Sequence, residues 1–90
     1  MMKGRYLEVT YRQGKPFAAY VYLPRPTGAK SVRTKEAAPG ILGDFAGSGE
    51  PIGLEITAPT HVTADRINSV VARLGLPILS PEELAPLTAA

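Results

Sequence analysis

The stretch Glu50–Pro59, EPIGLEITAP, decides the fold of this chain. Successive side chains of a β-strand point to opposite faces of the sheet, and the apolar residues here fall at every second position. In a strand, Ile52, Leu54 and Ile56 therefore share one buried face. Glu55 falls on the opposite face, so we interpret it as part of the solvent side of the strand and not as a catalytic carboxylate.

An amphipathic helix is predicted next, in the stretch Val62–Pro77, VTADRINSVVARLGLP. Thr63 is a good N-cap, and Gly75 suits the left-handed residue that follows the last turn of many helices. Four apolar residues at helical spacing form one stripe: Ile67, Val70, Val71 and Leu74. The pattern predicts a helix of about three turns that lies on the apolar face of the sheet.

The N-terminal half contains two further alternating segments, Arg5–Tyr11 and Phe17–Leu23. Gly14 and Pro16 lie between them, and both are turn residues. The two segments therefore predict a hairpin with a loop of about five residues, in which Tyr11 and Phe17 lie on the apolar faces.

The middle of the chain predicts an edge strand and a second hairpin. Ser31–Ala37 alternates weakly, and its Lys and Arg side chains would discourage pairing with other molecules. Ile41–Phe45 and Pro51–Ile56 flank the glycine-containing turn Ala46–Glu50. After the main helix, Ser80–Leu84 repeats a helix start signal, which predicts a single helical turn before a frayed tail.

These elements predict an α+β fold: a small, mostly antiparallel sheet of four to five strands in two hairpins, with one amphipathic helix packed on one face and a short C-terminal helical turn. The 90 residues, 44% of them apolar, are enough for one core and too few for two. We therefore expect a single domain over residues 1–90, with an ordered core at about 5–79 and a helical turn and tail at 80–90.

Composition excludes several classes of protein. The chain has no cysteine, which removes disulfides, thiolate nucleophiles and cysteine metal sites. Its longest apolar stretch, Phe17–Leu23, is far shorter than the roughly 20 residues of a membrane span, and the N-terminus has no hydrophobic signal core. We expect a soluble cytoplasmic protein without a membrane partner.

The sequence offers little for catalysis or cofactor binding. His61 is the only histidine, and nothing near it in the sequence would orient it as a general base. The glycine-rich stretch Gly43–Gly53 lacks the Lys-Ser/Thr of a phosphate loop and precedes a strand instead of a helix. We therefore expect no metal, no cofactor and no enzyme, and an active site around His61 and Glu55, with Asp44, is the least favoured function.

Charge is divided unevenly along the chain. Residues 1–35 carry eight basic side chains and one acidic one, whereas residues 36–90 carry two basic and seven acidic ones. Such a division can indicate a basic face that binds nucleic acid. We favour the alternative, in which basic and acidic strands lie side by side in one sheet and neutralise each other, because cross-strand charge pairs need no partner molecule.

Three tyrosines are the most distinctive feature of the basic N-terminal half. Tyr6, Tyr20 and Tyr22 can share an exposed strand face, with Arg5, Arg12, Lys15 and Arg25 around it. Rings beside cations can stack on single-stranded bases, but tyrosines also pair across strands or lie in a subunit interface, as in a homodimer. With the loop Pro24–Lys30 included, the candidate interaction surface comprises Tyr6, Tyr20, Tyr22, Arg25 and Lys30.

The order of these motifs resembles an uncharacterised bacterial family, numbered twenty-two eighty-three among the domains of unknown function. The matching residues are Tyr11, Tyr20, Val21, Leu23, Glu36, Gly40, Ile41, Asp44, Gly49, Ile52, Gly53, Leu54, Glu55 and Ile56. The chain departs from the family pattern after Tyr11, where basic and polar residues replace an aspartate and an acidic loop. The resemblance implies a small β-rich domain with a C-terminal helix and no assigned activity.

Some members of that family look like partners of small toxin-like proteins. The leading expectation is therefore a non-catalytic protein-interaction module, antitoxin-like in role. The alternative is a nucleic-acid-binding module that uses the basic, tyrosine-rich N-terminal hairpin.

Overall fold

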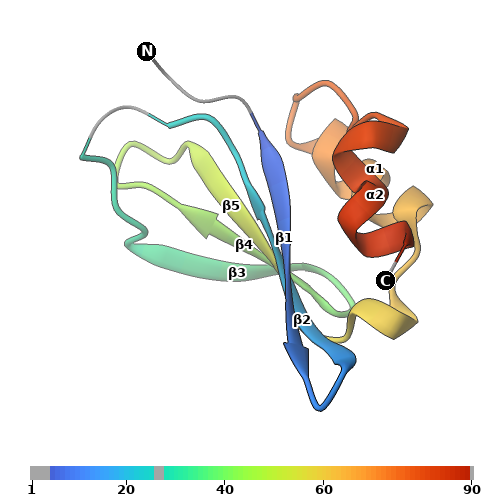
Figure 1. Cartoon of the computed structure of the whole chain (residues 1–90). Coiled ribbons are helices and arrows are strands. Elements are labelled where there is room, and N and C mark those ends of the chain that lie inside the picture. Colours follow the sequence, from blue (N-terminus) through green and yellow to red (C-terminus); the bar gives the residue numbers. More distant parts are fainter. Residues whose placement is uncertain (1–4, 26–27, 90) are drawn as a thin grey trace.

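The computed structural model describes residues 5–25 and 28–89. One antiparallel sheet of five strands has both α-helices on the same face (Figure 1). The elements in chain order are β1 (Tyr6–Arg12), β2 (Lys15–Tyr22), β3 (Arg33–Ala38), β4 (Ile41–Phe45), β5 (Pro51–Ile56), the 3₁₀ turn η1 (Pro59–His61), α1 (Ala64–Arg73) and α2 (Pro81–Thr88). The strands lie in the order β1-β2-β5-β4-β3. The predicted α+β class is confirmed, with β3 as an edge strand.

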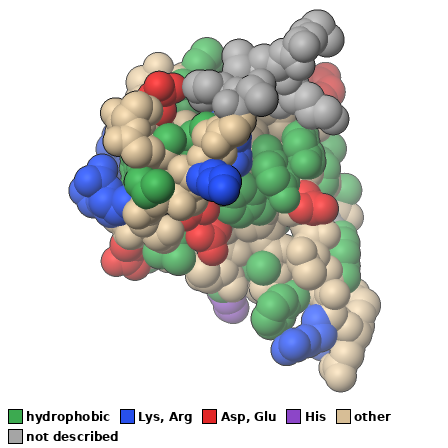
Figure 2. All heavy atoms as spheres, turned by 90° about the vertical axis from the view of Figure 1, so that its left-hand side faces the viewer, with side chains coloured by type: hydrophobic (Ala, Val, Ile, Leu, Met, Phe, Trp, Pro, Cys, Tyr) green, Lys and Arg blue, Asp and Glu red, His purple; other side chains and the backbone are tan. Residues whose placement is uncertain are grey.

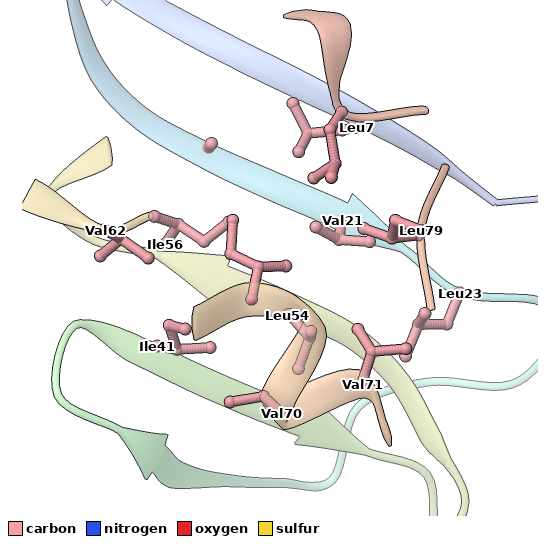
Figure 3. Packing of buried hydrophobic residues seen from close by; sticks show 13 residues of the cluster. Leu7, Val21, Leu23, Ile41, Leu54, Ile56, Val62, Val70, Val71 and Leu79 are labelled. Carbon is pink, nitrogen blue, oxygen red and sulfur yellow. The ribbon is translucent and has the colours of Figure 1, made fainter. Parts of the chain in front are cut away.

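The strand β5 occupies the centre of the sheet, between β2 and β4. Leu54 pairs with Val21 on one side and with Gly43 on the other, and both Leu54 and Ile56 are completely buried. Figure 3 shows Leu54, Ile56 and Ile41 packed against the α1 residues Val70 and Val71. Burial of such side chains contributes about 1.5–3 kcal/mol each, so this layer dominates the stability of the fold.

The helix α1 begins and ends where its capping residues predict. The Thr63 hydroxyl accepts a hydrogen bond from the Arg66 amide at 3.1 Å. At the other end Gly75 has a φ of 79°, and the amide of Leu76 donates to the Val71 carbonyl at 3.2 Å. This is the Schellman arrangement, which closes the last turn and directs the chain back along the sheet.

The first hairpin turns more tightly than the sequence predicted. Gln13 and Gly14 both have positive φ, 53° and 76°, and form a two-residue turn in place of a loop of about five residues. The tip of this hairpin extends beyond the helices (Figure 1). Consequently the rings of Tyr11 and Phe17, which the sequence placed on the apolar faces of the strands, are half exposed, at 52% and 50%.

The C-terminal helix α2 is longer than the single turn expected and is tied to β1. Ser80 and Glu83 form a capping box, and Leu84 is 5% exposed in the core. The Arg5 guanidinium forms an ion pair with Glu83 at 3.1 Å and also donates to the carbonyl of Ile78 at 3.2 Å. These contacts hold both ends of the described chain together. Within the described residues, neither helix has the length and apolar character needed to cross a bilayer.

Candidate functional site

Neither α1 nor α2 covers the second face of the sheet, and we call this second face the open face. Register places two rows of side chains across all five strands on this face. One row is Tyr6, Tyr22, Gly53, Asp44 and Thr34, and the next is Glu8, Tyr20, Glu55, Leu42 and Glu36. Figure 2 views the molecule from the side away from the helices and shows hydrophobic side chains with both acidic and basic side chains around them.

The three tyrosines contact one another at the β1–β2 side of the open face. The Tyr6 and Tyr22 rings stack with their centroids 4.5 Å apart and their planes at 12°. The Tyr20 ring meets Tyr22 edge to face at 4.7 Å and 62°. The structure thus brings together the three aromatic residues that the sequence singled out.

Asp44 lies at the centre of a hydroxyl network. Its side chain is 6% exposed, and its two oxygens accept hydrogen bonds from Tyr20 at 2.8 Å and from Thr34 at 2.6 Å. Burial, followed by the hydrogen bond to Asp44, raises the pKa of Tyr20 above its usual range. Tyr20 therefore stays a neutral hydrogen-bond donor at physiological pH.

A second carboxyl group stands beside Asp44. Glu55 lies diagonally across from it on β5, since Glu55 pairs with Leu42 and Gly53 pairs with Asp44. The pKa of Glu55 is raised, first by burial and then by the charge of Asp44 and a hydrogen bond with it. Among the described residues the only ion pair joins Arg5 and Glu83, so neither carboxyl group of this pair has a cation within ion-pair distance.

Glu8 supplies a third carboxylate next to the rings. The Tyr22 hydroxyl donates to it at 3.0 Å, and this hydrogen bond raises the pKa of Tyr22. Two of the three tyrosines thus orient their hydroxyl groups toward acids. We call the whole set, Tyr6, Tyr20, Tyr22, Glu8, Asp44 and Glu55, the acid–aromatic cluster.

The cations predicted to surround the tyrosines are mostly directed elsewhere. Arg5 binds Glu83 on the helix side of the sheet, and the Arg12 guanidinium lies 4.5 Å from the centroid of the Phe17 ring. Arg25 stays closest to the cluster, where it donates to the Ile52 carbonyl at 2.8 Å. Lys30 is exposed and, in the described part of the chain, makes no hydrogen bond or ion pair. The loop that carries these two residues includes positions 26 and 27, which lie outside the described residues.

His61 does not join the carboxyl pair. It is exposed in η1, and no hydrogen bond or ion pair links it to Glu55 or Asp44 in the described structure. Of the three residues weighed as a catalytic set, the fold brings together only Asp44 and Glu55. The described residues also contain no group of three or more His, Asp or Glu side chains placed to hold a metal ion.

A separate groove lies between the two helices. It has a volume of about 380 Å³ and is lined by Ala64, Asp65, Asn68, Ile78, Leu79, Pro81, Leu84 and Thr88. The Asn68 amide exchanges hydrogen bonds with the backbone of Leu79 at 2.7 and 3.2 Å. The Asn68 amide, a polar group of the groove, is therefore already engaged in holding the connection between α1 and α2.

Sequence reasoning overlooked Glu8, Thr34 and Gly53 as parts of this site. Strand alternation alone could have placed Leu42 and Asp44 on the open face, opposite Ile41. It could not reveal that Tyr20, 24 residues away along the chain, reaches Asp44.

Comparison with known proteins adds no relative, because no family model, curated protein or solved structure matches this chain. The resemblance to the bacterial family remains a prediction from sequence motifs.

Proposed function

We propose that this chain is a non-catalytic protein-interaction module that binds a partner through its open face. The observation that carries the proposal is that both helices cover one side of the sheet, while three packed tyrosines and several carboxyl groups occupy the other. Tyrosine rings provide large, rigid contact area with a polar tip, and they are enriched in protein interfaces.

The arrangement of the carboxyl groups supports binding over catalysis. A general base must reach a substrate proton, but both Asp44 oxygens already accept hydroxyl groups at 2.8 and 2.6 Å. In the described part of the chain, no hydrogen bond or ion pair joins Glu55 to a histidine or a lysine, and its neighbour Asp44 is occupied by two hydroxyl groups, so no second base is free to divide the roles of acid and base. The raised pKa of Tyr20 also keeps its hydroxyl from acting as a nucleophile.

The charge of the open face favours a protein partner over nucleic acid. The exposed Glu8 and Glu36 and the partly exposed Glu55 lie in its two rows, and phosphates would be repelled by them. An antitoxin-like role, as the sequence resemblance implies, requires a face of this kind that stays available for a second protein. A symmetric homodimer through the same face would set the acids of one copy against those of the other.

Site-specific photo-crosslinking in cells of the source organism tests this proposal. A benzophenone amino acid is placed at Glu36 or Ala18 on the open face, and at Ala72, which is exposed on α1, as the matched control. We expect a discrete adduct from the two open-face positions and none from Ala72. Adducts from Ala72 alone, or equally from all three positions, would refute the open face as the binding surface.

A further inference from the structure

We propose that the partner presents an arginine side chain to the acid–aromatic cluster, where the guanidinium stacks on a tyrosine ring and pairs with Glu55. This inference rests on the proposed function and specifies the chemistry of the partner. The occupant is therefore a protein segment with an exposed arginine, and not a second copy of the chain.

Acidic side chains are concentrated on the open face, although the chain as a whole is basic. The whole chain has a net charge of +2, yet the two open-face rows contain three solvent-accessible acids, Glu8, Glu36 and Glu55, beside the buried Asp44. Among the described residues, the Arg25 guanidinium donates to the Ile52 carbonyl at 2.8 Å and lies beside the Tyr20 hydroxyl, but it forms no ion pair with the carboxyl groups. A cationic partner complements such a face, whereas two copies brought face to face would oppose like charges.

The carboxyl pair at the centre, Asp44 and Glu55, forms no ion pair with a cation of the described residues. The chain is able to pair an acid with an arginine, as it does for Glu83 and Arg5 at 3.1 Å. Within residues 5–25 and 28–89, Glu55 and Asp44 have no such partner, although like charges at diagonal sheet positions repel each other. Binding sites often contain groups whose arrangement lowers the stability of the fold. A cation from the partner would offset the repulsion between Glu55 and Asp44.

The rings favour arginine over lysine. A guanidinium is planar, so it can stack on an aromatic ring while its edge donates two parallel hydrogen bonds to a carboxylate. The chain uses the same stacking twice within itself, with Arg12 at 4.5 Å from the Phe17 centroid and Arg33 at 5.6 Å from that of Phe45. Tyr20 and Tyr22 are partly exposed and lie next to Glu55 and Glu8.

An NMR titration of the ¹⁵N-labelled chain with capped peptides tests the inference. The probes are tetra-arginine, tetra-lysine and an uncharged Gly-Ser peptide of equal length. We expect tetra-arginine to shift the amides of residues 20–22, 42–44 and 53–55 most, and to bind at least about fivefold more tightly than tetra-lysine. Equal binding of the two basic peptides, or shifts spread over both faces, would overturn the assignment to arginine.

Two charge-neutralising variants make the test specific. Glu55→Gln should weaken tetra-arginine binding at least about tenfold, because it removes a charge-assisted hydrogen bond. Glu82→Gln removes the same charge from an exposed position on α2 and should leave the affinity unchanged. Equal affinities of the two variants would mean non-specific attraction and would refute the proposal.

The two proposals fail in different ways. If crosslinks form from Glu36 and Ala18 but tetra-arginine does not bind, the interaction module stands and the arginine chemistry is wrong. If no open-face crosslink forms, the proposed function itself is wrong, whatever the peptides do. Amide shifts that depend on protein concentration without peptide would instead show that a second copy occupies the face.

Discussion

The hydroxyl of Tyr20 occupies the space that a side chain at Gly53 would need. A Cβ atom built on Gly53 would lie 1.8 Å from that hydroxyl oxygen, whereas real Cβ contacts are never so short. The absent side chain lets Tyr20 lie across β5 and reach Asp44 on β4 at 2.8 Å. Gly53 thus has a steric role at the centre of the open face, in a strand where glycine is otherwise unfavourable.

Gly53→Ala should therefore destabilise the protein by about 1–2 kcal/mol, because Tyr20 must swing away and lose its hydrogen bond. Urea unfolding measures the change. Gly47→Ala is the matched control, since a Cβ at Gly47 meets nothing within 4 Å and should change stability by less than about 0.5 kcal/mol. In a Tyr20→Ala background the effect of Gly53→Ala should largely disappear, and an unchanged effect would contradict the steric explanation.

Glu55→Gln should stabilise the protein at neutral pH. The pKa of Glu55 is raised in the folded state, first by burial and then by Asp44, so the folded state binds more protons than the unfolded state between the ordinary and the raised pKa. The wild type consequently loses stability as pH rises through this window. We expect Glu55→Gln to be more stable by about 0.5 kcal/mol at pH 7 and equal to the wild type near pH 3.5.

Thermal unfolding of both proteins at the two pH values measures this difference. A variant that is less stable at pH 7, or a difference that does not depend on pH, would show that Glu55 is not strained by its neighbour. The same substitution is expected to weaken arginine binding, so the residue would combine a stability cost with a binding gain.

Glu83 should show the opposite pH dependence. The hydrogen bond from the Ser80 backbone amide, and then the charge of Arg5, lower the pKa of Glu83. Its contribution to stability is therefore present above the ordinary pKa and is lost as pH falls through the lowered one. Glu83→Gln should cost about 1–2 kcal/mol at pH 7 and progressively less below pH 4 in urea unfolding. The neighbouring Glu82→Gln, without these contacts, should change stability by less than about 0.5 kcal/mol, and equal losses would contradict the capping argument.

Local patterns explain which parts of the fold could be predicted. The alternation of Ile52, Leu54 and Ile56 and the capping residues of α1 depend on neighbours within a few positions, and both predictions were confirmed. The first turn was missed because Gln13 at a φ of 53° is an unusual residue for a two-residue turn, in which Asn or Asp normally precedes Gly.

The site could be predicted only in part, because it depends on strand order. Alternation places Tyr20 and Tyr22 on one face of β2 from the sequence alone. That β2 lies beside β5, and therefore within reach of Asp44, is a long-range pairing that no local period encodes. The direction of Arg5, toward Glu83 78 residues later, is equally non-local, and it explains why Arg5 does not join the tyrosines as the sequence predicted.

The Asp44 network should behave as one energetic unit. Asp44→Ala removes the acceptor of two hydroxyl groups, Tyr20 and Thr34, in a position that is 6% exposed, so we expect a loss of about 2–4 kcal/mol. Tyr20→Phe alone should cost about 1 kcal/mol, because it removes one of the two hydrogen bonds. In the Asp44→Ala background the same Tyr20→Phe change should be close to neutral, since the hydroxyl then has no carboxylate to bind. A double-mutant cycle by urea unfolding measures the coupling, and additive losses would mean that Tyr20 and Asp44 act independently in spite of their 2.8 Å contact.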